Sequence, residues 1–254
     1  MSKVSVLIAV YNASQYLPAC LDSLVVQTHA DFQAICIDDA STDDSLRILQ
    51  DYAARDNRFC VLPLKENGGQ AHARNVGLHV AEGDYVCFLD ADDWFDSAAL
   101  VEFLNKLEAL ETDMAVTHFT ILHADGTREL TRYTVYGREP YDYSRVYSLD
   151  DVLADGHIRY FLMHAIAYRT ELLRRSGYRQ SEGISYTDTE WASIPLFHAD
   201  PVVFLDINLY QYNLGREGQT MDPKVVARSL DQMEQMTMQT ITTIANTIDA
   251  KDEY

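Results

Sequence analysis

Three carboxylates follow directly on an apolar run in the first half of this chain. Tyr85–Leu89 holds five strand-prone apolar residues, and Asp90, Asp92 and Asp93 come next. A folded protein does not usually crowd like charges at a strand end without a counter-charge. Mg2+ and Mn2+ prefer oxygen ligands and commonly take one or two carboxylates while a phosphate fills other positions. The stretch therefore predicts a site for Mn2+ or Mg2+.

Helix capping is the other interpretation of these aspartates. Asp92, Asp93 or Asp96 precedes a helix that we expect to start near Ser97, and aspartate is a preferred residue at the start of a helix. Capping explains one aspartate well and three poorly. We therefore favour metal or ligand binding for the group.

The elements that must position these acids alternate between strands and helices. This alternation predicts the α/β class, with a mostly parallel, Rossmann-like sheet covered by helices on both faces. The expected strands are Val4–Val10, Phe32–Ile37, Phe59–Leu64, Tyr85–Leu89 and Met114–Leu122, and the expected helices include Gln70–Val80 and Ala98–Leu110.

A second acidic pair, Asp38 and Asp39, closes the strand Phe32–Ile37. In a parallel sheet, ligands bind beyond the carboxyl ends of the strands, near a switch in strand order. Both acidic groups fall at such an end, so the fold should bring two groups that are distant in sequence to one rim. That convergence favours a ligand site more strongly than either group alone.

The pattern changes after Leu122. The segment Arg132–Tyr147 holds five tyrosines without a clear period, and we expect them to pack an irregular loop, with stacking on sugar rings as the alternative. A helix is expected from Asp188 through Phe197. Short helices are also expected at Leu149–Ala154 and Thr170–Ser176, and short strands at Ala165–Tyr168, Pro201–Leu205 and Leu209–Tyr212.

We divide the chain into a domain of residues 1–222, with halves 1–122 and 123–222, and a C-terminal amphipathic helix of residues 223–254. A helix of this kind docks on its own domain, pairs with a second copy in a homodimer, or lies on a membrane, and the sequence leaves these three open. Its apolar stripe holds Val226, Leu230, Met233, Ile241, Ile244 and Ile248.

The amino-acid composition indicates which classes of partner and which cellular compartment to expect. The net charge of −19 over 254 residues argues against nucleic acid and against binding to anionic lipid by charge alone. There is no run of 18 apolar residues, so we expect a cytoplasmic protein, or one bound peripherally at the inner face of a membrane. The four cysteines show no CxxC spacing, which predicts reduced structural residues rather than a zinc site.

Four motifs in this order and spacing resemble the family-2 glycosyltransferases, enzymes of GT-A fold that use nucleotide-diphosphosugars. The resemblance covers at least residues 4 to 115, and four ordered motifs are a far stronger signal than one Asp-x-Asp. The motifs are Val4–Asn12, Ile37–Asp43, Asn67–Gly69 with Ala73–Gly77, and Gly83–Tyr85 with Leu89–Trp94.

The resemblance implies a donor site in residues 1–122. In that family the first strand end and the acidic pair after the second strand hold the base, usually uracil, and the Asp-x-Asp region holds ribose and metal. We expect Asp39 to accept the base N–H, because an ionised carboxylate is purely an acceptor. Arg74 lies near the phosphates or pairs instead with a rim aspartate, and Arg216 closes over the diphosphate or is a surface arginine. The implied nucleotide-binding residues are Ala9, Tyr11, Asp38, Asp39, Asn67, Arg74, Asp90 and Arg216, and the implied metal ligands are Asp92, Asp90 and Asp93.

The resemblance also implies an inverting mechanism with a carboxylate base in residues 123–222, the acceptor-side half. The family usually carries this base as the aspartate of a Glu-Asp pair after a glycine-containing loop, and Gly183–Asp188 resembles that place. Thr187 departs from the usual glutamate. We therefore select Asp188, with Glu190 as the alternative. As plain structure, Asp188 has the character of a helix N-cap and Glu190 of a first-turn acid.

The expected activity is transfer of one hexosyl or N-acetylhexosaminyl unit from a UDP-sugar to a saccharide or lipid-linked saccharide, in the synthesis of a surface polysaccharide or glycolipid. The chain lacks the Gln-x-x-Arg-Trp motif and the membrane spans of the processive synthases that the family also contains. A catalytically silent sugar-nucleotide-binding subunit of a glycan-assembly complex is the alternative. A nucleotidyltransferase is disfavoured, because Asn12–Gln15 has neither glycines nor a basic residue.

Overall fold

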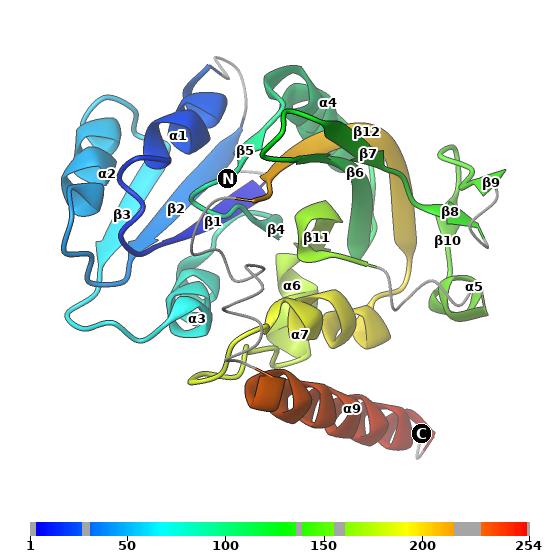
Figure 1. Ribbon diagram of the computed structural model, residues 1–254. Coiled ribbons are helices and arrows are strands. Elements are labelled where there is room, and N and C mark those ends of the chain that lie inside the picture. The colour runs from blue at the N-terminus through cyan, green and yellow to red at the C-terminus, as the bar shows by residue number, and fades with distance from the viewer. Residues whose placement is uncertain (1–3, 27–30, 136–138, 155–160, 216–229, 253–254) are drawn as a thin grey trace.

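Strands from both halves of the chain join one 10-stranded sheet in the computed structural model, which describes residues 4–26, 31–135, 139–154, 161–215 and 230–252 (Figure 1). The strand order is β10-β12-β6-β11-β4-β1-β2-β3, with β5 beside β12 and β7 beside β6. The strands are β1 (Val4–Val10), β2 (Phe32–Asp38), β3 (Phe59–Pro63), β4 (Tyr85–Phe88), β5 (Trp94–Phe95), β6 (Met114–Leu122), β7 (Arg128–Thr131), β10 (Val146–Tyr147), β11 (Ile166–Arg169) and β12 (Val202–Asn213).

The first four strands form the parallel half that the sequence predicts. β1 lies between β2 and β4 and pairs with both in parallel, with Val10 opposite Asp38 and Leu7 opposite Phe88. Their side chains are almost all buried, as expected for strands covered on both faces. The order of the strands switches at β1, because β2 and β3 lie on one side of it and β4 on the other. Such a switch is where an open α/β sheet binds its ligand.

The second half of the sheet is mixed. β12 pairs with β6 in parallel, but β11 inserts between β4 and β6 and runs antiparallel to both. Two expected short strands, 201–205 and 209–212, are one strand, β12, with irregular register between Phe204 and Tyr210. Residues 206–208, which separate the two expected strands, include the polar Asp206 and Asn208. In the structure they lie at this irregularity, where a strand accommodates an extra residue without ending.

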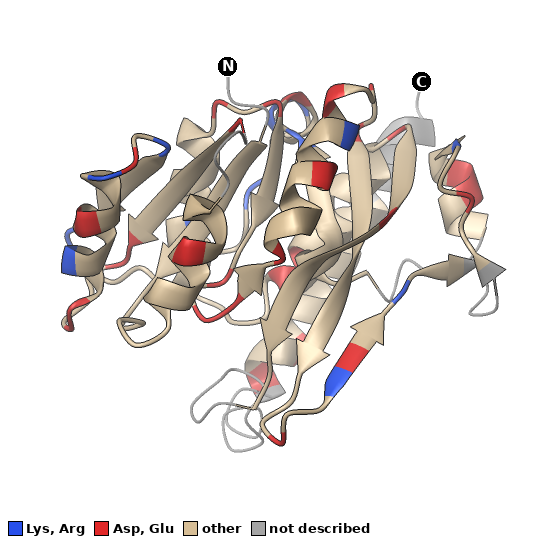
Figure 2. Ribbon diagram, turned by 90° about the horizontal axis from the view of Figure 1, so that it is seen from above, with Lys and Arg blue, Asp and Glu red and all other residues tan. Residues whose placement is uncertain are grey.

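Helices cover both faces of the sheet, as Figures 1 and 2 show. Gly77 lets α3 approach β1 and β2 closely, because a Cβ there would lie 2.8 Å from Leu7 Cδ2 and 2.9 Å from Ile37 Cδ1. Figure 2 also shows the excess of acidic over basic positions. One face carries α1 (Leu17–Val25), α2 (Ser45–Ala53) and α4 (Ser97–Glu108), and the other carries α3 (Gln70–Val80), α6 (Thr170–Arg175) and α7 (Asp188–Ser193).

The other predictions concern single helices, the tyrosine-rich segment and the cysteines. α5 spans Leu149–Ala154 as expected, and Tyr133, Tyr141 and Tyr147 are buried, which confirms the packing interpretation of the tyrosine-rich segment. That segment also holds β8 (Thr134–Val135) and β9 (Glu139–Pro140). The helix predicted through Phe197 is wrong in its second half: α7 ends at Ser193, and a 3-10 helix, η3 (Pro195–His198), follows because Pro195 has no N–H for the helical ladder. The four cysteines are free.

The C-terminal helix docks on its own domain. α9 (Leu230–Asp252) packs on α7 and η3, with Met236 and Thr240 buried (Figure 1). The predicted stripe is partly wrong, since Ile241 is exposed and the buried face passes through Met236 and Thr240, four residues apart. The expected start of the helix, 223–229, lies outside the described residues. Among the described residues no helix has the length and apolar character needed to cross a membrane.

Candidate active site

A cavity of about 750 Å3 lies at the carboxyl ends of β1, β2 and β4, at the switch in strand order. It reaches the N-terminal end of α3, the start of α7 and the end of β12. Of the predicted site residues, those that line it are Ala9, Tyr11, Asp39, Asn67, Asp90, Asp92 and Asp188. The sheet therefore brings three sequence-distant acidic groups to one cavity. The cavity is not lined by Asp38, Arg74, Asp93 or Glu190, and Arg216 lies outside the described residues.

The Asp39 side chain is bound to the backbone just before the start of α3. Its two carboxylate oxygens accept the N–H groups of Gly68 and Gly69, each at 2.8 Å. Gly69 has a φ of +84°, a conformation that glycine adopts without strain, so the glycine pair is needed for this close turn. The side-chain amide of Asn67 donates to the backbone carbonyl of Asp39 at 3.2 Å. A carboxylate has about four lone-pair positions, so Asp39 keeps acceptor capacity toward the cavity.

Asp38 lies behind the lining. One of its carboxylate oxygens accepts the N–H of Ser41 at 3.2 Å, and the other, Oδ1, is buried without a hydrogen-bond partner in the described residues. Asn12 has a φ of 50° and accepts the N–H of Thr42 at 2.8 Å. The turns after β1 and β2 are therefore hydrogen-bonded to one another.

Arg74 joins two acids that are 98 residues apart in the chain. From α3 its guanidinium donates to Asp188 Oδ1 at 2.5 Å and to Asp90 Oδ1 at 2.8 Å, and it stacks on the ring of Phe88 at 4.7 Å. Burial lowers the pKa of Arg74, but the carboxylates of Asp188 and Asp90 outweigh this and raise it. Of the two interpretations of Arg74, pairing with rim aspartates is the one that the structure displays.

The aspartates after β4 differ in their surroundings. Burial, together with Asp188 and Asp92, raises the pKa of Asp90 to about 6, against the opposing effect of Arg74. Asp93 is fully buried and accepts hydrogen bonds from the Tyr210 hydroxyl at 2.6 Å and from the Asn213 N–H at 2.8 Å. Burial raises its pKa as well. Asp93 therefore ties the acidic segment to β12.

Helix capping falls to Asp96 alone among the three candidates. Its side chain accepts the N–H groups of Ala98 and Ala99 at the start of α4, each at 3.0 Å. Asp92 lines the cavity, and Asp93 bonds to β12. The extra aspartates thus have another role than capping.

The two candidate bases point to different places. Asp188 is the first residue of α7, after Thr187, and its half-exposed carboxylate lines the cavity. It is not the helix cap. Glu190 is buried, and its oxygens accept the N–H and the hydroxyl of Ser181 at 2.8 and 2.6 Å. Glu190 therefore holds the preceding loop, whereas Asp188 faces the space where a substrate fits.

His164 is a cavity residue that the sequence interpretation missed. It lies in the 3-10 turn η2 (Met163–Ala165), just before β11, and its ring stacks on Tyr212 at 4.4 Å and packs against Tyr210 at 4.7 Å. Asp90, Asp93 and His164 each offer one potential metal-ligand atom, all within 4.8 Å of one another. A single histidine beside an apolar run carries no sequence signal for a ligand, because its place depends on how β11 enters the sheet.

The family model described as Glycosyl transferase family 2 matches residues 5–177. This chain belongs to the family-2 glycosyltransferases. The matched residues run from β1 through β11 and α6, so they include most strands of the sheet.

Proteins similar to this family-2 glycosyltransferase match between 45% and 85% of its length. The uncharacterised glycosyltransferase EpsJ of Bacillus subtilis strain 168 is 31% identical over 215 residues, covering 82% of this chain and 60% of EpsJ. The poly(ribitol-phosphate) beta-glucosyltransferase of Bacillus spizizenii is 38% identical over 117 residues, covering 45% of this chain and 18% of that protein. The structure of S. aureus TarS 1-349 in complex with UDP-GlcNAc aligns with a TM-score of 0.70 and 26% identity, over 85% of this chain and 60% of that one, which confirms the GT-A fold. The chain thus spans 60% or less of each.

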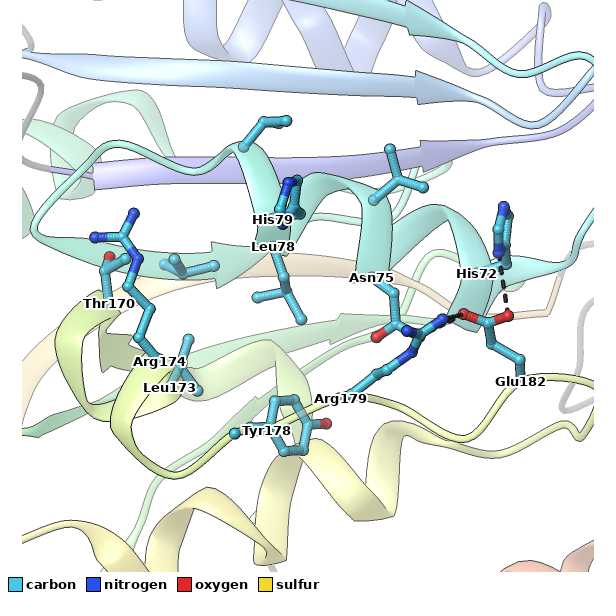
Figure 3. A pocket seen from close by; sticks show the side chains of 14 residues that line it. His72, Asn75, Leu78, His79, Thr170, Leu173, Arg174, Tyr178, Arg179 and Glu182 are labelled. Carbon is cyan, nitrogen blue, oxygen red and sulfur yellow. Dashed lines mark hydrogen bonds and ion pairs between the residues drawn. The ribbon is translucent and has the colours of Figure 1, made fainter.

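A second cavity, of about 500 Å3, lies between α3 and the segment from α6 to Glu182 (Figure 3). Its polar end shows how this glycosyltransferase fixes the loop before Asp188. Glu182 accepts hydrogen bonds from Asn75 at 2.9 Å and Arg179 at 2.5 Å and pairs with His72 at 3.2 Å. Asn75 also bonds to the backbone of Gln180 in both directions, each at 2.9 Å. Helix α3 therefore binds both the loop before Asp188, through Asn75, and the candidate base Asp188 itself, through Arg74.

Proposed function

We propose that this family-2 glycosyltransferase is an inverting, metal-dependent enzyme that moves one hexose or N-acetylhexosamine from a UDP-sugar to an acceptor hydroxyl. The proposal rests on the negative charge of the cavity. Asp39, Asp90, Asp92 and Asp188 line it, and no lysine or arginine in the described part of the chain does. A diphosphate brings further negative charge, so its binding in this cavity requires a cation.

The residues at the end of β4 suit a hard divalent cation such as Mn2+ or Mg2+. Asp90 and Asp92 line the cavity and Asp93 lies behind them, so several carboxylate oxygens are available in one place. Arg74 and Tyr210 hold two of these carboxylates in position. When bound, such an ion offsets the charge that develops on the leaving diphosphate, which is Lewis-acid catalysis.

Asp188 acts as the base of the proposed reaction. Arg74 holds its Oδ1, which leaves Oδ2 to accept a proton from the acceptor hydroxyl. As the acceptor oxygen bonds to the anomeric carbon, its proton passes to Oδ2. The bond from that carbon to the diphosphate breaks, and its electron pair leaves with the diphosphate. Attack from the opposite face inverts the configuration.

The UDP-sugar donor is supported by TarS, whose structure holds UDP-GlcNAc, and by the position of Tyr11, Asp39 and Asn67 in one cavity. A saccharide or lipid-linked saccharide of a surface polymer is the acceptor class that we propose. The poly(ribitol-phosphate) beta-glucosyltransferase among the relatives supports this choice.

Asp188→Asn tests the proposal. We expect transfer from UDP-GlcNAc or UDP-glucose to fall by about 100- to 10,000-fold, because the base is removed while the shape is kept. UDP binding in Mn2+, measured by calorimetry, should stay within a few-fold. Asp151→Asn on the surface of α5 is the matched control and should leave both unchanged. Activity that survives both chelator and Asp92→Asn would refute the metal assignment.

A catalytically silent sugar-nucleotide-binding subunit is the second candidate. The ion pair between Arg74 and Asp188 favours it, together with Thr187 in place of the family's usual glutamate, because Arg74 already occupies one oxygen of the candidate base. UDP binding without turnover in both the wild type and Asp188→Asn would select this candidate.

A further inference from the structure

His164 sits in the donor cavity in a fixed orientation. Besides the two tyrosine contacts, its ring lies 5.5 Å from the ring of Phe119. Aromatic neighbours on several sides leave the imidazole little freedom to rotate. Its nitrogen atoms are therefore held in place before any ligand binds.

One nitrogen of His164 has no partner. Nδ1 is buried and makes no hydrogen bond to the described residues, although metal-bound and structural histidines alike usually satisfy both ring nitrogens. A neutral imidazole carries one nitrogen lone pair that can bind a metal ion.

The acids nearby are arranged to share an ion with this ring. Asp90, Asp93 and His164 offer one ligand atom each within 4.8 Å of one another. Two ligands on opposite sides of Mn2+ or Mg2+ lie about 4 Å apart, so a small inward movement completes such a site. The Asp93 oxygens each accept one hydrogen bond, from Tyr210 and Asn213, and each keeps a free lone pair.

We propose that His164 is a nitrogen ligand of the divalent cation in the donor cavity, beside Asp90 and Asp93, and that it biases the site toward Mn2+ over Mg2+. The proposal rests on the metal-dependent function proposed above. Oxygen ligands alone serve Mg2+ well, whereas imidazole is a better ligand for first-row transition metals. The enzyme would therefore take Mn2+ in preference at equal concentrations of the two ions.

His164→Phe tests this assignment, because phenylalanine keeps an aromatic ring between Tyr210 and Tyr212 but has no nitrogen. Mn2+ binding is measured by electron paramagnetic resonance, with Mn2+ alone and with Mn2+ plus UDP. We expect Mn2+ affinity to fall by at least about tenfold and the advantage of Mn2+ over Mg2+, measured by competition, to shrink. His118→Phe is the matched control: His118 also buries an Nδ1 without a partner, but it pairs with Asp206, so Mn2+ affinity should be unchanged.

Spin-echo modulation from a nitrogen nucleus in the wild-type protein is the second measurement, and it does not depend on how a variant folds. Modulation that is present in the wild type and in His118→Phe but lost in His164→Phe supports the proposal. One bound Mn2+ without nitrogen modulation overturns it while leaving the metal-dependent function intact. If the wild type binds no Mn2+ with or without UDP, both this inference and the metal part of the proposed function are refuted.

Discussion

Replacing Arg74 by methionine should destabilise the metal-free protein by about 3 kcal/mol. Methionine keeps much of the length and the apolar contact with Phe88 but leaves Asp90 and Asp188 without their shared cation. Opposite charges about 4 Å apart attract by about 4 kcal/mol at an effective dielectric constant of about 20. The Asp188 side chain is 47% exposed, so water screens much of its share, while the Asp90 side chain is only 23% exposed.

The expected value is therefore the lower end of the roughly 3–5 kcal/mol lost when one partner of a buried ion pair is removed. For a chain of this size it corresponds to a fall in melting temperature of about 6–12 °C. Urea unfolding monitored by circular dichroism measures the free energy, with chelator present. Arg145→Met is the matched control, because Arg145 pairs with Asp151 and lies over Tyr147 while half exposed, and should change stability by less than about 1 kcal/mol.

A double variant separates charge compensation from packing. Adding Asp188→Asn to Arg74→Met removes one of the uncompensated charges, so the double variant should be less destabilised than the sum of the two single changes, by about 1 kcal/mol. A destabilisation below about 1 kcal/mol for Arg74→Met alone, or strict additivity in the double variant, would show that the guanidinium does not compensate these carboxylates.

Three further outcomes follow from single residues. Because the pKa of Asp90 is raised to about 6 in the folded state, protonation of Asp90 stabilises the fold fully below pH 3.8, and this stabilisation is lost as pH rises through about 6. Mn2+ binds the ionised carboxylate, so it should raise the melting temperature more at pH 7.5 than at pH 5, and equal shifts at the two pH values would contradict this. Hydrogen bonds, first from Asn75 and then from Arg179, lower the pKa of Glu182 to about 2, so Glu182→Gln should be less stable than the wild type above pH 4.5, with the difference vanishing as pH falls through 2 in acid unfolding. A difference that stays constant with pH would show that these hydrogen bonds do not depend on the ionised Glu182 carboxylate. Gly77→Ala should cost about 1–3 kcal/mol in urea unfolding because its methyl group meets Leu7 and Ile37, and an unchanged midpoint would mean that α3 can shift outward.

The sequence predicts the donor rim well because every part of it depends on local patterns. Strands β1, β2 and β4 are largely apolar, and residues that follow such strands in a parallel sheet must meet at one edge. Asp39 and Asp90 therefore reach one cavity without any knowledge of side-chain packing. The same kind of local signal gives α3 its observed limits, since Gly68 and Gly69 precede it and a polar, glycine-containing turn follows it.

The acceptor side is predicted less well because it depends on how distant segments pair. β11 enters antiparallel between β4 and β6, and no local pattern specifies that direction. His164 is placed by this strand, so its position beside Asp90 has no trace in the sequence. The sequence likewise predicts two strands separated at residues 206–208, whereas the pairing of β12 with β6 continues past them. Tertiary pairing decides these cases over local preference.

Arg74 links two acidic groups of the cavity that lie far apart in the chain. The guanidinium binds one carboxylate of the proposed metal site and the proposed base at once, so a change at Asp90 is felt at Asp188 through a single side chain. A cation that binds Asp90 competes with Arg74 for the same carboxylate, and Arg74 then keeps Asp188 as its partner. Arginine suits this place because its planar group binds two oxygens in fixed directions, which lysine does not do. Arg74 on α3 therefore links the proposed donor site to the proposed base.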